Sequence, residues 1–186
     1  MGSLHKLPNV TVLPLAVTLG ESIGAAVSSV TRAKLDYLVN NAGTQCVMPM
    51  LDFDIKQAKD MLEVNVWGLL TVTQAFSPFV LAAKGTIVNM SSVGALLWIP
   101  YKAVYGSSKS AVAAIDEGLR IELKPFGVNV VTVMVGAVQT KLFDNAPEHH
   151  LPPDSSYKAA EEEISDWATG RDRTASAASA RTVRAS

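Results

Sequence analysis

Residues 85–111, GTIVNMSSVGALLWIPYKAVYGSSKSA, carry the strongest structural signal in the chain. The apolar run 86–90 predicts a strand and ends in Ser91-Ser92. A loop that contains Pro100 follows, and then a helical stretch with Tyr105 and Lys109. Because Lys109 lies four residues after Tyr105, both side chains leave one face of the helix, one turn apart.

A phenol beside an ammonium group is a candidate proton donor. The positive charge favours the phenolate and therefore lowers the pKa of the tyrosine towards the working pH of an enzyme. The alternative for Tyr105 and Lys109 on their own is a partly exposed helical pair without a chemical role.

Two further stretches accompany this segment. An apolar run at 35–39 leads into the stretch 40–43, Asn-Asn-Ala-Gly, and Asn65 lies in the sequence Val-Asn-Val-Trp-Gly at 64–68. With the strand, the serine pair and Tyr-x-x-x-Lys, these motifs resemble the short-chain dehydrogenase/reductase family over residues 9–145. The resemblance implies an α/β fold with a Rossmann-like, doubly wound parallel sheet, and an NAD(P)-dependent enzyme.

The resemblance also implies roles for individual residues. The implied catalytic set is Asn65, Ser92, Tyr105 and Lys109, with Ser92 preferred to Ser91 because it lies thirteen residues before Tyr105. The implied cofactor-binding set is Asn40, Asn41, Ala42, Gly43, Tyr105, Lys109, Val138 and Thr140. The implied cofactor is NADP(H), and NAD(H) stays open because the segment that selects the ribose is not recognisable.

Plainer interpretations exist for several of these residues. The stretch 40–43 could be a strand-terminating turn, since Asn and Gly favour turns. Asn65 interrupts a helical pattern, and its amide could bond the backbone instead of holding a water for a proton relay. His149 and His150 are adjacent to Glu148, but two neighbouring histidines are more often solvated than bound to a metal, so we expect no metal site.

The N-terminal part sets an expectation about completeness. Residues 9–17 predict a strand, and Thr18 is a candidate cap for a helix that carries Ile23, Val27 and Val30 at helical spacing. Gly20 and Gly24 do not make a phosphate loop by this interpretation, because Ala26 stands at the third glycine position. Residues 9–33 then match the family's third strand and following helix, so its first two strands and glycine-rich turn are expected to be absent. That would leave an unpaired sheet edge or a direct pairing of strands three and four.

The remaining chain predicts alternating elements and a loose end. Helices are predicted at 53–83 and 103–123, and buried strands at 35–39, 85–92 and 128–135. A mobile substrate loop is expected at 141–157. We expect a partial Rossmann-like domain at 1–157 and a loose tail at 158–186, of which 170–186 is small, polar and mildly basic. Small residues at 111, 113 and 114 allow close helix packing, and in the family this helix commonly forms a dimer interface, which implies a homo-oligomer.

Composition excludes several classes of function. The 186 residues carry 16 Lys+Arg and 17 Asp+Glu, so charge offers no case for nucleic acid or an anionic membrane. The lone Cys46 permits no internal disulfide and suits a reducing compartment. No uninterrupted apolar run reaches the ~18 residues of a transmembrane span, and no signal-peptide core follows Met1. A cytoplasmic protein is expected.

A closer resemblance concerns the stretches around 48–76, 83–89 and 136–140. They are similar to fungal NADPH-dependent 1-acyldihydroxyacetone-phosphate reductases, which implies reduction of a ketone on a lipid-like precursor, at the endoplasmic reticulum or lipid droplets. Two alternatives stay open: a secondary-metabolite ketoreductase, and an inactive fragment that keeps the catalytic residues without a cofactor phosphate site.

Overall fold

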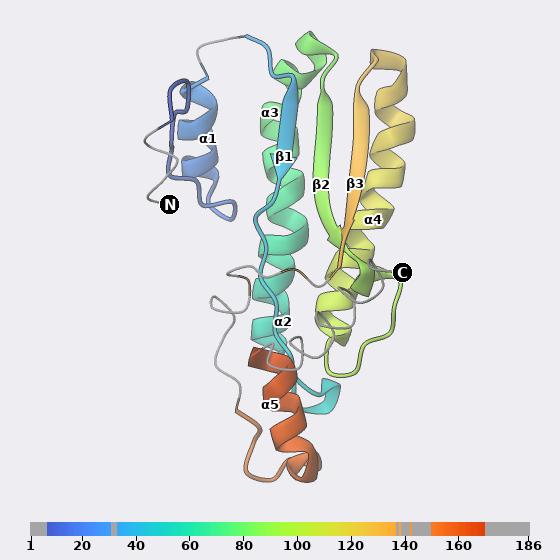
Figure 1. Cartoon of the computed structure of the whole chain (residues 1–186). Coiled ribbons are helices and arrows are strands. Elements are labelled where there is room, and N and C mark those ends of the chain that lie inside the picture. Colours follow the sequence, from blue (N-terminus) through green and yellow to red (C-terminus); the bar gives the residue numbers. More distant parts are fainter. Residues whose placement is uncertain (1–6, 31–32, 137, 139–141, 143–149, 170–186) are drawn as a thin grey trace.

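The computed structural model describes residues 7–30, 33–136, 138, 142 and 150–169. Its centre is a sheet of three parallel strands in the order β1-β2-β3, formed by Tyr37–Asn40, Thr86–Ser92 and Asn129–Val135. In register, Leu38 pairs with Ile87, which pairs with Val130. Figure 1 shows the long helices α3 (Leu69–Ala83) and α4 (Ala103–Leu123) behind this sheet. The arrangement confirms an incomplete Rossmann-like α/β fold.

The predicted helices are present with small changes at their ends. The region 53–83 forms α2 (Ile55–Leu62), a π-helical turn η3 (Glu63–Gly68) and α3 without interruption. Asp54 caps α2 by accepting a hydrogen bond from the backbone N–H of Lys56. The other helices are α1 (Gly20–Ser28), α5 (Glu161–Thr169) and the 3₁₀ turns η2 (Met50–Asp52), η4 (Val93–Ala95), η5 (Lys124–Phe126) and η6 (Lys158–Ala160).

The core lies between the sheet and its helices. Leu38 and Ile87 point towards α3, where Val72, Phe76 and Val80 meet them. On the opposite face, Tyr37 and Val39 are largely exposed, because no helix of the described residues covers that side. The expectation of strands buried on both faces is therefore wrong for β1 and also for β3, which alternates between buried and exposed residues.

The N-terminal prediction fails in two respects. Residues 9–17 form no strand, since Pro14 cannot donate to a ladder and the N–H of Ala16 donates to Ser22 Oγ at 2.9 Å. Thr18 does not cap α1; Leu19 occupies that position without a side-chain hydrogen bond. The helix itself is confirmed and buries Ile23. β1 consequently has no strand partner on its outer side within the described part of the chain, as expected for an unpaired edge.

The C-terminal end is more ordered than the sequence pattern indicated. Residues 158–169 form η6 and α5 instead of a loose tail, and Ile164 is fully buried in a cluster with Phe53 and Met61. Periodicity was weak there because a helix of nine residues carries only a few apolar residues. Of the expected substrate loop, 150–157 is described, and Ser155 Oγ donates to Asp52 Oδ2 at 2.6 Å. Residues 170–186 lie outside the described residues.

The continuous helix Ile55–Ala83 is long and apolar enough to cross a membrane by length and composition. The sequence interpretation had found no run of that kind, because polar residues interrupt it. In the fold this helix packs Val72, Phe76 and Val80 into the core beneath the sheet.

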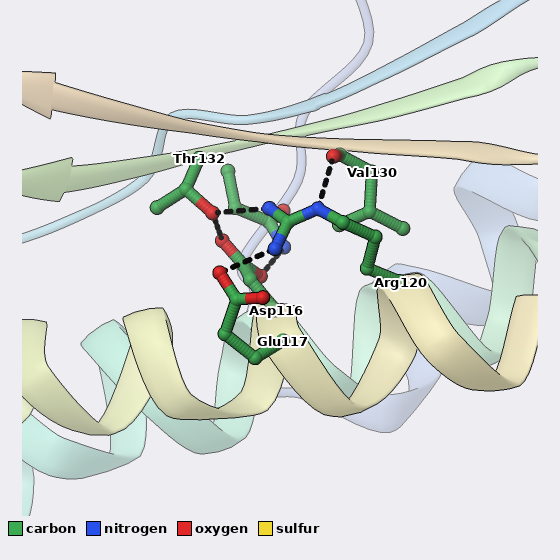
Figure 2. Close-up of polar contacts among 6 residues, drawn as sticks. Asp116, Glu117, Arg120, Val130 and Thr132 are labelled. Atoms are coloured by element: carbon green, nitrogen blue, oxygen red, sulfur yellow. Dashed lines mark hydrogen bonds and ion pairs between the residues drawn. The ribbon is translucent and has the colours of Figure 1, made fainter.

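A buried polar network ties β2 and β3 to α4 (Figure 2). Asn89 Nδ2 donates to Asp116 Oδ1, and Thr132 Oγ1 donates to Asp116 Oδ2 at 2.6 Å. Arg120 donates to Thr132 Oγ1 at 3.3 Å and to the Val130 carbonyl at 3.2 Å. Burial raises the pKa of Asp116, against the opposing effect of these hydrogen bonds. The network fixes α4, which carries the tyrosine and lysine, against the sheet.

Candidate active site

The stretch 40–43 follows β1 at the carboxyl end of the sheet, where open α/β sheets bind ligands. Asn40 is buried and donates through Nδ2 to Thr73 Oγ1 at 2.9 Å and to Asn89 Oδ1 at 2.8 Å. Its amide therefore holds the strand against α3 and β2. The next three residues are exposed, so they are the part of this motif that a ligand can reach.

Asn65 lies in the π-helical turn η3, a helix irregularity that is common at functional sites. Its Oδ1 accepts from the backbone N–H of Thr44 at 2.8 Å, and its Nδ2 donates to the Thr44 carbonyl at 2.9 Å. Nδ2 also donates to Ser108 Oγ at 3.0 Å. The Asn65 side chain thus has the structural role that was the alternative: its amide joins the loop after β1 to α4. Its Oδ1 can accept a second hydrogen bond, so the relay role stays a prediction.

Lys109 is buried on the inner face of α4, and Nζ donates to the Met90 carbonyl at 2.8 Å. Burial lowers its pKa from 10.5 to about 8. Nζ lies 5.9 Å from the centre of the Tyr105 ring. A Cβ atom placed on Gly43 would lie only 3.5 Å from Nζ. The ammonium group is therefore near both the tyrosine ring and the exposed loop after β1; the helical spacing predicted the first of these neighbours.

Ser92 ends β2, and its Oγ accepts from the backbone N–H of Gly94 at 3.1 Å. A Cβ atom on Gly94 would lie 3.4 Å from Ser92 Oγ and 3.8 Å from Tyr105 Cε1. The serine hydroxyl and the tyrosine ring therefore converge beside Gly94. Ser91 faces the other way and donates to the Lys109 carbonyl at 2.9 Å, which is a structural role. Strand alternation places the two serine side chains on opposite faces of the sheet, and the catalytic role of Ser92 stays a prediction.

Three residues that sequence reasoning missed position this group. Gly106, inside the Tyr-x-x-x-Lys motif, lets α4 approach η4, since a Cβ there would lie 2.9 Å from the Gly94 carbonyl oxygen. Ser108 accepts from Asn65 and donates to the Tyr105 carbonyl at 2.7 Å. The third is Thr44, whose backbone N–H donates to Asn65 Oδ1 and whose carbonyl accepts from Asn65 Nδ2. Only Gly106 gave a signal, because glycine is costly inside a helix without a reason.

Two predicted cofactor residues lie beyond this group. Val138 is half exposed past the end of β3, and Thr140 lies outside the described residues. The exposed residues 41–43 and the nearby Lys109 ammonium group leave backbone and a hydrogen-bond donor accessible to a ligand such as a nicotinamide dinucleotide. No glycine-rich turn joins a strand to a helix within 7–30 or 33–136. The described residues thus offer contacts for part of NAD(P)(H) and no glycine-rich turn for its diphosphate.

The arrangement places a serine hydroxyl and a tyrosine ring beside the buried Lys109 ammonium group. Such an arrangement stabilises negative charge that develops on an oxygen and can deliver a proton to it. Among the described residues, no group of three His, Cys, Asp or Glu side chains could hold a metal ion. His149 is outside those residues.

Known proteins resemble this chain in sequence. A family model for short chain dehydrogenases matches residues 4–151. Short-chain dehydrogenase PC-15 of Penicillium crustosum is 46% identical over 93% of this chain and 64% of that protein. NADPH-dependent 1-acyldihydroxyacetone phosphate reductase of Schizosaccharomyces pombe is 38% identical over 83% of this chain and 56% of that protein. The chain spans less than two thirds of the length of these relatives.

Solved structures agree. A short-chain dehydrogenase from Streptomyces avermitilis superposes with a TM-score of 0.71 at 28% identity, covering 88% of this chain and 64% of that one. A short chain dehydrogenase from Burkholderia cenocepacia, in complex with NADP, superposes with a TM-score of 0.68 at 31% identity. This match covers 86% of this chain and 65% of that one. Both the family model and the fold confirm the resemblance drawn from the motifs, and the chain belongs to the short-chain dehydrogenase family.

Proposed function

We propose that the protein is an NADP-dependent oxidoreductase that reduces a ketone to an alcohol. The observation that carries the proposal is the convergence of Ser92 and Tyr105 beside Gly94, with the Lys109 ammonium 5.9 Å from the tyrosine ring. This group lies at the carboxyl end of a parallel sheet, and the relatives are named as dehydrogenases and a reductase.

In the proposed mechanism, Tyr105 donates its phenolic proton to the carbonyl oxygen of the substrate. Ser92 donates a hydrogen bond to the same oxygen and so favours the charge that grows in the transition state. Lys109 stabilises the phenolate left behind, because a nearby positive charge favours the ionised phenol. Asn65 holds the loop after β1 against α4, which keeps Tyr105 and Lys109 in position relative to that loop.

When bound, NADPH would supply the hydride. The residues proposed to hold it are Asn40–Gly43, Tyr105, Lys109, Val138 and Thr140, with the exposed backbone at 41–43 nearest the lysine. The choice of NADP is supported by the name of the NADPH-dependent relative and by the NADP complex among similar structures.

The proposed substrate is an acyl-dihydroxyacetone-phosphate-like lipid precursor, after the reductase relative. A secondary-metabolite ketone is the second candidate. We further propose a cytoplasmic location with peripheral contact to endoplasmic reticulum or lipid droplets, and a homo-oligomer formed through α4. The rival proposal is an inactive fragment without a site for the cofactor diphosphate, for which the described residues offer no glycine-rich turn.

Titration of the purified protein with NADPH, followed by fluorescence, separates the two proposals. An enzyme binds with saturation and oxidises NADPH in the presence of a ketone, and Tyr105→Phe abolishes turnover while NADPH still binds. Absence of saturable binding at millimolar NADPH would favour the fragment. Full activity in Tyr105→Phe would end the proposed mechanism.

A further inference from the structure

A fully buried carboxylate, that of Asp116, lies on α4 seven residues after Lys109. Residues seven apart on a helix share one face to within about 20° and are separated by about 10 Å along the axis. Asp116 therefore faces the sheet, as Lys109 does. A buried charged group is costly unless hydrogen bonds satisfy it, so the partners of Asp116 decide what this residue contributes.

Both oxygens of the Asp116 carboxylate accept hydrogen bonds from the sheet. Oδ1 accepts from Asn89 Nδ2 on β2, and Oδ2 accepts from Thr132 Oγ1 on β3 at 2.6 Å (Figure 2). Asn89 Oδ1 in turn accepts from Asn40 Nδ2 on β1 at 2.8 Å. One line of side-chain hydrogen bonds thus crosses the strands β1, β2 and β3 and is attached to α4 at Asp116.

Three consecutive residues of β2 bond to α4. Asn89 donates to Asp116, and the Met90 carbonyl accepts from Lys109 Nζ at 2.8 Å. Ser91 Oγ donates to the Lys109 carbonyl at 2.9 Å. Strand β2 therefore holds the helix at two points, Lys109 and Asp116, which are two helical turns apart. Two such points fix both the position and the direction of α4 on the strand, whereas one alone would let the helix pivot.

The contact that depends on this attachment is the approach of Ser92 to Tyr105. Both lie beside Gly94, but the serine belongs to β2 and the tyrosine belongs to α4. Tyr105 and Lys109 are on the same helix, so a pivot of α4 leaves their spacing unchanged. The same pivot changes the distance between the tyrosine and the serine, because only one of them moves with the helix.

We propose that Asp116 is a positioning residue for the proton transfer: it holds α4 on β2 and β3 so that the Tyr105 phenol and the Ser92 hydroxyl reach one substrate oxygen. This inference rests on the proposed reductase function. Alanine at position 116 removes both acceptor oxygens and adds no volume. Asparagine keeps one acceptor for Asn89 and can donate to the Thr132 hydroxyl, so it preserves most of the attachment.

The first measurement is steady-state kinetics of the whole chain, well below the melting temperature, with NADPH and 1-palmitoyl-dihydroxyacetone phosphate. The variants are Asp116→Ala, Asp116→Asn and Ile23→Ala. Ile23 is buried on α1, which makes none of these contacts, so its truncation is the control for a loss of stability alone. We expect Asp116→Ala to lower kcat about ten- to a hundredfold with little change in KM. Asp116→Asn should keep most of kcat, and Ile23→Ala should keep all of it.

A second measurement needs no turnover. Burial holds the pKa of Lys109 at about 8, and NMR titration of its side chain follows this pKa, with Lys109→Met to identify the signal. If α4 pivots in Asp116→Ala, Lys109 Nζ leaves the Met90 carbonyl for water, and its pKa rises towards 10.5. Loss of the Asp116 charge by itself would lower the pKa of Lys109. Asp116→Asn and Ile23→Ala should leave it near 8.

The outcomes separate this inference from the proposed function. Absence of turnover in the wild type would contradict the reductase, while a raised Lys109 pKa in Asp116→Ala would still support the positioning role. Turnover with equal kcat in Asp116→Ala and Ile23→Ala, or an unmoved Lys109 pKa, would overturn the positioning role alone. If Asp116→Ala does not fold, Thr132→Val decides in its place, because it removes one of the two donors and keeps the volume. We expect it to lower kcat about three- to tenfold, and wild-type kcat in this variant would overturn the inference.

Discussion

Replacement of Lys109 by methionine should stabilise the fold while it removes the proposed chemistry. The lysine is buried, and its pKa falls from 10.5 to about 8 because burial penalises the ammonium group. Its described hydrogen bond goes to the Met90 carbonyl. Methionine has a similar length and needs no solvation. The substitution therefore removes a buried charge and leaves one carbonyl without its donor.

The magnitude follows from the two pKa values. A difference between 10.5 and about 8 corresponds to about 3 kcal/mol at neutral pH. Loss of the hydrogen bond to the Met90 carbonyl destabilises the variant by about 1 kcal/mol. Lys109→Met should therefore raise the free energy of unfolding by about 2 kcal/mol at pH 7. Because the folded pKa is the lower one, the unfolded state binds more protons between the two values, and wild-type stability rises with pH across that window. Below pH 8 both states are protonated and the penalty is constant.

The assay is urea unfolding of wild type and Lys109→Met at pH 7 and pH 10, with the exposed Lys124→Met as the matched control. At pH 10 only about 1 kcal/mol of the penalty remains, so the advantage of Lys109→Met should fall to about zero. The control should show no such change. Equal differences at both pH values would refute the reasoning, since the charged lysine would then cost nothing to bury.

Further changes test other parts of the fold. Gln45 Nε2 is buried with no hydrogen-bond partner in the described structure, so Gln45→Leu should raise thermal stability by about 1 kcal/mol; a lower melting temperature would contradict this. In Gly106→Ala the new Cβ would lie 2.9 Å from the Gly94 carbonyl oxygen, and we expect a loss of about 1–3 kcal/mol in denaturant unfolding, together with lower kcat. Asp116→Leu should cost about 3 kcal/mol because the Thr132 hydroxyl loses its acceptor, whereas Asp116→Asn should cost under ~1 kcal/mol; equal losses would argue against the network.

The active-site segment was predictable because its signals are local. A strand ending in a serine and a helical four-residue spacing each depend on a few neighbouring residues, and the structure brings Ser92, Tyr105 and Lys109 together accordingly. The helix 103–123 was predicted at the bounds that α4 has, since Lys124 and Gly127 (φ 73°) end it with ordinary stop signals.

Predictions that depended on distant partners were wrong. Residues 9–17 have the composition of a strand, but a strand needs a neighbour to accept its hydrogen bonds, and none is present among the described residues. The apolar run of β1 indicated burial on both faces, whereas Tyr37 and Val39 lie on a face that no described helix covers. Likewise α5 is held by burial of Ile164 against residues more than a hundred positions earlier, such as Phe53, and short sequence windows contain no trace of such a contact.

The difference between local and distant contacts also applies to the candidate active site. Each described side-chain hydrogen bond of Ser92 and Lys109 ends on a residue between 90 and 109, and the close approach of Gly94 and Gly106 lies in the same stretch. Gly43 adds the loop after β1, which approaches Lys109. α1 contributes to the core beneath α3 but to none of these contacts. The geometry for the proposed proton transfer is therefore built from the end of β2, the loop after β1, Asn65 and α4, whereas the described residues contain no glycine-rich turn for a cofactor diphosphate. For this reason, ketone binding and cofactor binding must be measured separately, because the first can be intact where the second is weak.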